Sequence, residues 1–332
     1  MRIIVAHTSP DMDAITSVWL IKKFLPGWDK AQVQFVPAGE AIGRTPEAGL
    51  SFKDPVERMG RNQVIHVDTG LGPLDHHQTL SDKICAASLT FDYVIKEMNE
   101  NLPEMGKEKL EALDRMVKVV VQVDHFKEVF WGEPTADYHE FSIVGILDGL
   151  KLEKPDSDQF YVDYVCQALD ALLHEFENRV WAEKEIKEHG TEFNTRFGKG
   201  IAFETVNDSV IKLSQKMGYV IVLRKDPRKG YVRIKARPDG PDRGPVSLFP
   251  RPMSSEDKLP AGTRRGAPAL ATPSNKGLNL TLAYEKLRKM DPEATWFLHV
   301  SKKMLLNGTV KNPKMKPTKL KLSDIIEVLR SI

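Results

Sequence analysis

The stretch RIIVAHTSPDMDAITSVWLIKKFLP, residues 2–26, decides the fold of this chain. Its first part, residues 2–6, is a short apolar run with the character of a strand, and it ends at His7. After a polar loop, residues 13–26 carry apolar side chains at roughly helical spacing as far as Pro26, which ends a helix. A strand, a loop and a helix in this order are typical of an α/β protein.

Further runs of the same two kinds follow. Residues 32–36 and 63–70 predict strands. Helices are expected from near Ala86, over 107–123 and over 161–188, because apolar side chains recur there every three or four residues. Since the strands alternate with helices, we predict an α/β fold with a parallel sheet.

The second half of the chain has a different pattern. A Pro- and Gly-rich stretch covers residues 238–273, which is long for a loop inside a compact domain, so it is either mobile or lies over a binding surface. We predict a catalytic domain over residues 1–190 and a smaller α+β domain over residues 191–332. Within the second domain the patterns predict strands at 201–206, 210–214, 219–225, 231–238 and 296–301, and helices at 278–290 and 322–332.

The composition narrows the class of protein. The 332 residues are 41% hydrophobic, which is enough to bury a substantial core. No run reaches the roughly 18 apolar residues that a membrane span requires, and the first residues show no cleavage pattern of a signal peptide. We therefore expect a cytoplasmic protein with no membrane partner. Two cysteines, Cys85 and Cys166, are too few and too far apart for a disulfide framework or a zinc cluster.

The net charge of +2 hides an asymmetry between the two halves. Up to residue 195 there are 20 basic and 34 acidic residues, and after it 28 basic and 12 acidic ones. The acidic half could hold cations and the basic half could attract anions. The alternative interpretation is that both sets are solvated surface charge.

Three short segments carry the residue types that bind divalent cations: 7–14, 67–78 and 123–126. Carboxylates and imidazoles suit manganese or magnesium, and a pair of such ions needs a carboxylate that bridges them. His7 and Asp68 each stand where a predicted strand ends, and ligand sites of parallel sheets form beyond such strand ends. We therefore expect the three segments to meet.

Two acids of the first segment, Asp11 and Asp13, stand one residue apart, directly before a predicted helix. An extended loop would direct their side chains differently, so that one acid could reach each metal. The simpler interpretation is a helix cap, which is common for Asp at this position. The combination with His7 and the later segments favours metal binding.

The doublet His76-His77 after Asp75 is the most specific local signal. Taken alone it could be a chance cluster on the surface. Asp68, a little upstream after an apolar strand and a Gly-rich turn, favours a catalytic role. Asp124 has the weakest individual case, because an Asp at the end of an apolar run is commonly a cap or a surface turn.

With these motifs the sequence resembles the DHH phosphoesterase superfamily, which is named after an Asp-His-His triplet. The matching segments are HTSPDMDA at 7–14, VDTG at 67–70, LDHHQ at 74–78 and VDHF at 123–126. Within the superfamily the chain is most similar to the Myg-type (melanocyte proliferating gene) exonuclease family, in which an RT dipeptide, here Arg44-Thr45, precedes the last three motifs. The resemblance implies a parallel-sheet DHH domain followed by a smaller α+β domain.

The resemblance also implies which residues bind metal. It implies a pair of divalent cations, manganese first and magnesium second, bridged by Asp68. The further ligands would be His7 and Asp11 at one cation, and Asp13, His76 and Asp124 at the other. Asp75 would orient a histidine, and His77 would contact the phosphate or the leaving group, so that the catalytic residues would be Asp68, Asp75 and His77.

The basic second half suggests an anionic polymer as the partner. A groove for single-stranded nucleic acid or an oligonucleotide would explain its charge, with Phe249 or Tyr231 available for base stacking, whereas a solvated basic face is the alternative. The expected substrate-binding residues are Arg44, Lys235, Arg237, Lys302 and Lys303.

We therefore predict a metal-dependent phosphodiesterase, acting as an exonuclease on single-stranded RNA, DNA or short oligonucleotides. A second enzyme class is a small-molecule phosphatase, such as a cyclic-dinucleotide phosphodiesterase or an inorganic pyrophosphatase, which HTSPDMDA also resembles. A third class is a non-catalytic nucleic-acid-binding protein whose metal cluster is structural. A homodimer is one assembly open to the chain.

Overall fold

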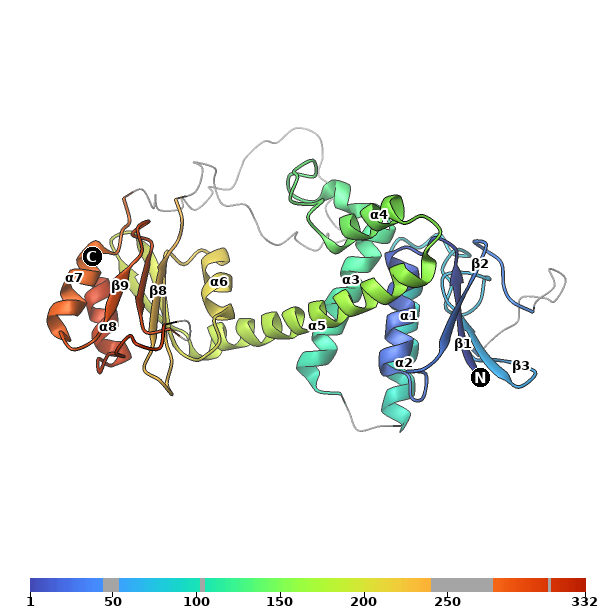
Figure 1. The fold of residues 1–332 in the computed structure, drawn as a ribbon, viewed down its shortest axis with the longest axis horizontal. Coiled ribbons are helices and arrows are strands. Elements are labelled where there is room, and N and C mark those ends of the chain that lie inside the picture. Colours follow the sequence, from blue (N-terminus) through green and yellow to red (C-terminus); the bar gives the residue numbers. More distant parts are fainter. Residues whose placement is uncertain (44–53, 102–104, 240–276, 310–311) are drawn as a thin grey trace, which may run out of the picture. The chain divides into compact units, whose positions relative to one another are not determined.

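The computed structural model describes residues 1–43, 54–101, 105–239, 277–309 and 312–332. These residues form a mixed α/β protein with two separate sheets, as Figure 1 shows. The chain divides into two compact units, Met1–Val180 and Trp181–Ile332. The division falls within the long helix α5 (Asp158–His189), ahead of the predicted boundary after residue 190.

The first unit is built on a four-stranded sheet with the order β2-β1-β4-β3. Three strands run parallel to one another, and the short edge strand β3 runs antiparallel to β4. The central strand β1 is buried from Ile3 to Ala6, as expected for a parallel strand covered on both faces. The strand bounds are β1 (Arg2–His7), β2 (Gln32–Val36), β3 (Glu57–Met59) and β4 (Asn62–His66).

Helices pack on one face of this sheet and form the core of the first unit. Ile4 and Ile65 of the sheet belong to the same buried cluster as Ile15, Leu20 and Leu113 of the helices. Helix α5 adds buried side chains at every fourth residue, namely Tyr161, Val165, Leu169 and Leu173. The helix bounds are α1 (Met12–Phe24), α2 (Ala86–Asn101), α3 (Lys107–Asp124) and α4 (Ile143–Glu153), with a 3-10 turn η1 (Lys127–Phe130) after α3.

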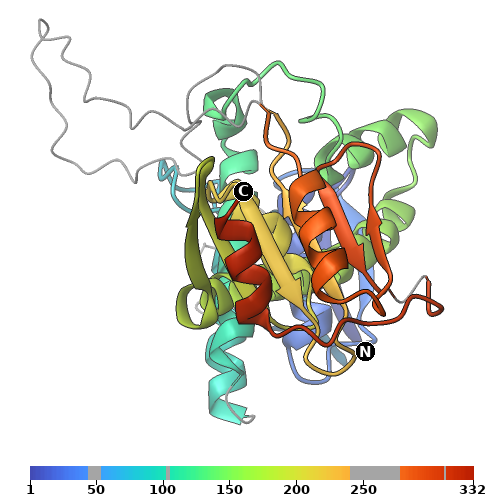
Figure 2. The ribbon, with the colours of Figure 1, turned by 90° about the vertical axis from the view of Figure 1, so that its left-hand side faces the viewer.

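The second unit has a six-stranded sheet with the order β5-β6-β7-β8-β10-β9, in which only the β6–β7 pair is parallel. Helices α7 (Thr281–Met290) and α8 (Leu322–Arg330) cover one face of it (Figure 2). Helix α6 (Ser209–Lys216) packs on the other face with the last turns of α5. The strand bounds are β5 (Thr191–Thr195), β6 (Gly198–Glu204), β7 (Ile221–Lys225), β8 (Val232–Ala236), β9 (Trp296–Leu298) and β10 (Met304–Asn307).

One predicted strand is wrong. Residues 210–214 lie in α6, where Val210, Ile211 and Leu213 are buried and Lys212 is exposed. The β-branched side chains favoured a strand, but the two buried pairs on either side of one exposed residue fit the turn of a helix. Burial on one face decided the structure against local propensity.

Two expectations fall outside the described residues. Arg44 is one, and the Pro- and Gly-rich stretch from residue 240 onward, which includes Phe249, is the other. In the part of the chain that the structure describes, no helix is both long and apolar enough to cross a bilayer.

Candidate metal centre

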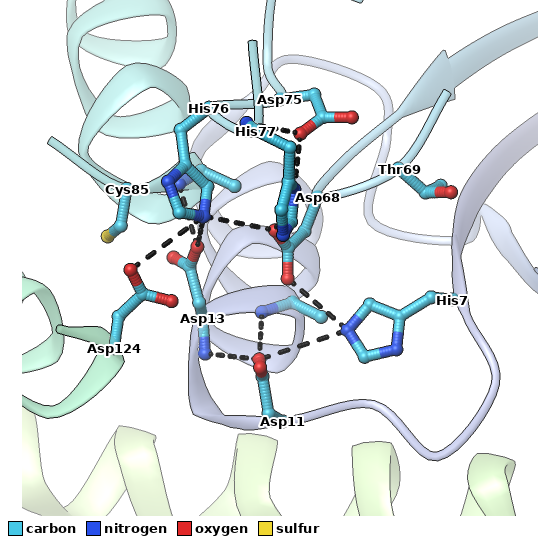
Figure 3. Close-up of polar contacts among 12 residues, drawn as sticks. His7, Asp11, Asp13, Asp68, Thr69, Asp75, His76, His77, Cys85 and Asp124 are labelled. Carbon is cyan, nitrogen blue, oxygen red and sulfur yellow. Dashed lines mark hydrogen bonds and ion pairs between the residues drawn. The ribbon is translucent and has the colours of Figure 1, made fainter. Parts of the chain in front are cut away.

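The loops that follow β1 and β4 meet at one edge of the first sheet. The two strands are parallel neighbours, with Val5 paired to His66, so the residues beyond their carboxyl ends lie side by side. His7 Nε2 is 3.3 Å from Asp68 Oδ2 as a result. Figure 3 shows the cluster that forms around this contact. The predicted residues brought together here are His7, Asp11, Asp13, Asp68, Asp75, His76, His77 and Asp124.

Asp68 lies between two groups of ligand atoms. Its Oδ2 faces His7, and its Oδ1 lies 3.6 Å from His76 Nε2 and 3.7 Å from His77 Nδ1. The residue is only 3% exposed and adopts the left-handed backbone conformation, with φ of 53°. A carboxylate that directs one oxygen to each of two groups has the arrangement that a bridging ligand needs.

The orientation of His7 is set by the backbone. Its Nδ1 lies 2.8 Å from the carbonyl oxygen of Thr8, so Nδ1 carries a proton and donates it to that oxygen. The other nitrogen, Nε2, is thereby directed at Asp68 and, at 4.0 Å, at Asp11 Oδ1. Metal-binding histidines commonly donate their second ring N–H to a carbonyl in this way.

The two acids of the first motif have different roles in the fold. Asp11 is the N-cap of α1, and its Oδ1 accepts the backbone N–H of Asp13 and of Ala14 at 2.9 and 3.0 Å. The cap interpretation therefore holds for Asp11, although the same side chain also faces His7. Asp13 is 1% exposed, and its two oxygens accept the first backbone N–H groups of α2, those of Ala86 and Ala87.

Three buried polar atoms converge without hydrogen-bond partners among the described residues: Asp68 Oδ1, His76 Nε2 and Asp124 Oδ2. His76 Nε2 lies 3.6 Å from Asp68 Oδ1, 3.7 Å from Asp124 Oδ2 and 3.6 Å from Asp13 Oδ2. These separations are too long for hydrogen bonds. Two atoms that each bind one cation at about 2.1 Å lie no more than about 4.2 Å apart, and the separation of His76 Nε2 from each of these three carboxylate oxygens meets that limit. Because unpaired buried polar atoms cost free energy, a divalent cation bound at His76 Nε2 and one of these carboxylates would be favourable.

The pKa values of the cluster show that its carboxylates favour positive charge on the neighbouring groups. Burial alone would lower the pKa of His7, but Asp68 and Asp11 outweigh it and raise that pKa to about 9. The Asp68 carboxylate likewise raises the pKa of His76 to about 9, against the effect of burial. Burial and the neighbouring charge of Asp68 raise the pKa of Asp13 to about 8. Without a cation, the histidines therefore retain protons that offset the acids.

Asp68 itself remains ionised. Burial would raise its pKa, but the neighbouring His7 and His76 outweigh that effect and lower the pKa to about 2. The pKa of Asp124 is raised, chiefly by burial. The cluster thus holds one firmly charged acid at its centre and less acidic ones around it.

Asp75 and His77 form a pair at the rim of the cluster. Asp75 Oδ1 lies 2.7 Å from His77 Nδ1 and also accepts the His77 backbone N–H, while Oδ2 accepts that of Leu71. Since a carboxylate accepts the proton of Nδ1, the Nε2 of His77 is the nitrogen left for other contacts. The His77 side chain is 58% exposed, so this nitrogen is available to a molecule that approaches the cluster.

One neighbour of the cluster was missed from the sequence. His125 has Nε2 2.9 Å from the carbonyl oxygen of Ile84 and 3.5 Å from Asp124 Oδ2, and its ring meets His76 edge to face. It joins α3 to the segment that carries Ala86 and Ala87. Its position directly after Asp124 was the available signal. Within the described residues, the triads with ligand atoms close enough to share an ion are His7-Asp11-Asp68, Asp68-His76-His77 and His76-Asp124-His125.

Cys85 also lies beside the cluster (Figure 3). Both cysteines are free thiols. Burial, with the charge of Asp13, raises the pKa of Cys85 and favours the neutral thiol. We therefore do not count Cys85 among the metal ligands.

The predicted substrate-binding residues of the basic half lie in the second unit, at one end of β8 and β10. Lys235 pairs with Met304, and the carbonyl oxygen of Lys303 accepts the N–H of Ala236. The Lys303 ammonium already binds Asp239 and the carbonyl oxygen of Leu278. Lys302 and Arg237 flank these positions. The structure brings these four residues together, and Arg44 lies outside the described residues.

A cavity of about 600 Å³ in the first unit contains none of the predicted site residues. It lies at the start of β1, where Arg2, Lys30, Arg58 and Arg61 line it. The candidate metal-binding cluster is at the other end of the same strand, after His7. The cluster is a candidate site because of its donor atoms, and not because it lies in a deep cavity.

Comparisons with known proteins add little. No protein-family model matches the chain, and no curated protein matches it. Among solved structures it is similar to an exonuclease RecJ bound to manganese, at 12% sequence identity over 71% of this chain and 77% of that chain, with a TM-score of 0.23. A likeness at this level carries no functional argument.

Proposed function

We propose that this chain is a two-metal phosphodiesterase of the DHH superfamily, similar to the Myg-type exonucleases, and that it cleaves single-stranded nucleic acid or short oligonucleotides. The observation that carries the proposal is the convergence of Asp68 Oδ1, His76 Nε2 and Asp124 Oδ2, three buried atoms without partners in the described structure. The order of the four motifs along the chain supports the superfamily.

The residues of the cluster divide into two cation sites. His7 and Asp11 would hold one cation and Asp13, His76 and Asp124 the other, with Asp68 between them. When bound, a pair of manganese or magnesium ions lowers the pKa of water and neutralises charge on a phosphate. Manganese is the ion that we propose first, because imidazole and carboxylate donors are mixed here.

The chain's own groups then act on the substrate. His77 presents its exposed ring at the rim of the cluster, where it would contact the phosphate or the leaving group. Asp75 fixes the orientation of that ring through the 2.7 Å contact with Nδ1. A positioned hydrogen-bond donor next to developing negative charge lowers the barrier for departure of the leaving group.

The basic second unit supports a nucleic-acid substrate over a small phosphate ester. Arg237 and Lys302, at the end of the second sheet, are the residues that we propose to contact phosphates. Lys303 is a weaker candidate, because Asp239 and Leu278 already bind its ammonium. Tyr231 is half-buried and lies beneath the Lys229 ammonium, 5.9 Å from its ring centroid, so we do not assign base stacking to it.

The test is a single assay of the full chain. Metal-free protein would receive Mn²⁺ and then be incubated with labelled single-stranded RNA, single-stranded DNA, a cyclic dinucleotide and pyrophosphate. We expect cleavage of an oligonucleotide by the wild type and its loss in Asp68→Asn, which keeps the shape of the side chain but removes its charge. The matched control is Asp92→Asn, on the exposed face of α2.

Each alternative has a distinct result in this assay. Turnover of pyrophosphate or the cyclic dinucleotide alone would assign the chain to the small-molecule phosphatases. Binding of the oligonucleotide without cleavage would indicate a nucleic-acid-binding protein with a structural cluster. Wild-type activity in Asp68→Asn would refute the bridging role of Asp68.

A further inference from the structure

The loop between His7 and Asp11 is held by two charged side chains that no motif contains. The backbone N–H of Ser9 donates to Asp158 Oδ1 at 3.0 Å, and the Lys151 ammonium donates to the carbonyl oxygen of Ser9 at 3.1 Å. Asp158 is the first residue of α5, and Lys151 is in the last turn of α4. The backbone N–H and the carbonyl oxygen of Ser9 are thus both bound by side chains that lie more than 140 residues further along the sequence.

Ser9 needs this support because of its conformation. Its φ is 51°, in the left-handed region, which costs free energy for any residue that has a Cβ. The residue is exposed, so no packing around its side chain accounts for the conformation. The two hydrogen bonds to Asp158 and Lys151 are the interactions that can offset this cost.

The conformation matters because Ser9 lies midway between two metal-binding candidates. His7 is the last residue of β1, and Asp11 is the N-cap of α1. The turn at Ser9 brings the chain back so that His7 Nε2 and Asp11 Oδ1 face each other at 4.0 Å. A different conformation at Ser9 would change that separation.

We infer that Lys151 and Asp158 are positioning residues, which hold Ser9 in the left-handed conformation and so set the distance between His7 and Asp11 at one cation site. The inference rests on the proposed function, because it requires that these two side chains bind a cation. Neither residue touches the substrate or the metal. We expect their effect to be confined to one of the two cation sites, because Asp13 lies in α1, Asp124 lies at the end of α3 and His76 follows β4, all outside the loop that contains Ser9.

The test measures binding of Mn²⁺ alone to the metal-free full chain by titration calorimetry, which resolves two sites without any assay of activity. We expect Asp158→Ala to weaken one site by about 10–100-fold, the usual effect of removing a residue that orients a ligand, and to leave the other unchanged. Asp158→Asn keeps an oxygen acceptor and should bind nearly as the wild type does. The matched control is Asp163→Ala, one turn further along α5, where the carboxylate binds Gln159.

Ser9→Gly provides a second, independent measurement. Glycine adopts a positive φ without steric cost, so the support from Asp158 becomes unnecessary. We expect Ser9→Gly to restore most of the lost affinity in the Asp158→Ala background and to change the wild type by less than about threefold. An equal effect in both backgrounds would show that Asp158 does not act through Ser9.

The remaining outcomes also decide the question. If Asp158→Ala weakens both sites together, the measurement is repeated with Lys151→Ala, and Lys154→Ala is its control. Weaker binding of Mn²⁺ at one site of Lys151→Ala supports the inference. Weaker binding at both sites, or at neither, overturns it. Unchanged binding by Asp158→Ala overturns it directly. If the wild type binds no Mn²⁺, both the proposed function and this inference are wrong. If the wild type and the variants bind Mn²⁺ equally well, only this inference is wrong.

Discussion

Asp124 Oδ2, at the last residue of α3, lies 3.7 Å from His76 Nε2, and both atoms are buried without hydrogen-bond partners among the described residues. A divalent cation bound to both atoms would satisfy the donor capacity that neither atom uses in the described structure. Asp124→Ala should therefore remove one of two bound Mn²⁺ ions and leave the other. Equilibrium dialysis of the metal-loaded variant measures the stoichiometry directly. Two retained ions would exclude Asp124 as a ligand.

The metal-free protein should become less stable as the pH rises from about 6.5 to about 9. His7 and His76 have pKa values of about 9, raised from 6.5, so their protonated forms stabilise the fold below pH 6.5 and that contribution is lost as the pH passes through 9. Asp13, with its pKa raised to about 8, acts in the same direction. Asp68, whose pKa is lowered to about 2, does not change its contribution in this range, because that contribution is complete above pH 3.8 and is lost only as the pH falls through about 2.

This pH effect should disappear when a cation replaces the protons. We expect the melting temperature in EDTA to fall by at least about 3 °C between pH 6.5 and 9, and to remain constant with Mn²⁺. The double variant His7→Gln/His76→Gln serves as the control and should show a smaller fall, since it lacks two of the three groups that titrate in this range. An equal fall with and without Mn²⁺ would mean that the protons and the metal do not share a site.

The pair formed by Asp75 and His77 predicts a variant that binds metal normally but reacts slowly. Asp75→Asn keeps an oxygen near the backbone N–H groups and loses the charge that fixes the His77 ring. We expect kcat on the oligonucleotide to fall about 10–100-fold while the number of bound Mn²⁺ ions stays the same. A change confined to KM would indicate that His77 contributes to binding only.

The basic end of the second sheet predicts a dependence on salt. For single strands, log K falls with log salt at a slope of about −0.7 for each phosphate neutralised. Arg237→Ala and Lys302→Ala should each reduce that slope by about 0.7, measured by fluorescence anisotropy with Asp68→Asn as the inactive parent. Lys289→Ala, on the exposed side of α7, is the control and should leave it unchanged. If the slopes for Arg237→Ala and Lys302→Ala are also unchanged, these residues do not contact the nucleic acid.

Asp291 should stabilise the second unit. It is buried after α7, and its Oδ2 accepts the hydroxyl of Thr318 at 2.7 Å and the backbone N–H of Lys319 at 2.9 Å. Asp291→Ala should cost about 1–3 kcal/mol in the free energy of unfolding at pH 7, measured in urea, whereas Glu285→Ala on the surface of α7 should cost little.

The same carboxyl gives this contribution a pH window. Its hydrogen bonds to Thr318 and Lys319 lower the pKa of Asp291 below 3.8, so the stabilisation is complete above that pH and is lost as the pH falls through the lower folded value. The difference between the wild type and Asp291→Ala should therefore shrink in acid. A difference independent of pH would mean that the charge of Asp291 contributes nothing.

The sequence was sufficient for the parts of the molecule that follow a periodic pattern. The strand at residues 2–6 and the helix after it could be predicted because burial on one or both faces repeats with the period of the element. The same logic predicted that His7 and Asp68 meet, since parallel neighbouring strands end at one edge. The helix at 210–214 was missed because Val210 and Ile211 favour strands locally, and only the position of α6 on its sheet makes it a helix.

Other features had no local signal. The edge strand β5 buries only Phe193, so it lacks the alternation that identifies a strand. Lys151 and Asp158 look like ordinary surface charges, and their contacts with Ser9 depend on how α4 and α5 pack against the first sheet. His125 could have been found from its place beside Asp124, but its bond to Ile84 could not.

Asp13 accepts two hydrogen bonds from the first backbone N–H groups of α2, so this acid of the cluster also stabilises the start of a helix. A protein of this fold that lost metal binding during evolution could more easily dispense with the acids at 68 and 124, each of which has a buried oxygen without a hydrogen-bond partner among the described residues. It could not as easily lose the acid at 13. An inactive descendant that retained this carboxylate would therefore retain it for its structural role, and its presence would not indicate that the descendant binds metal.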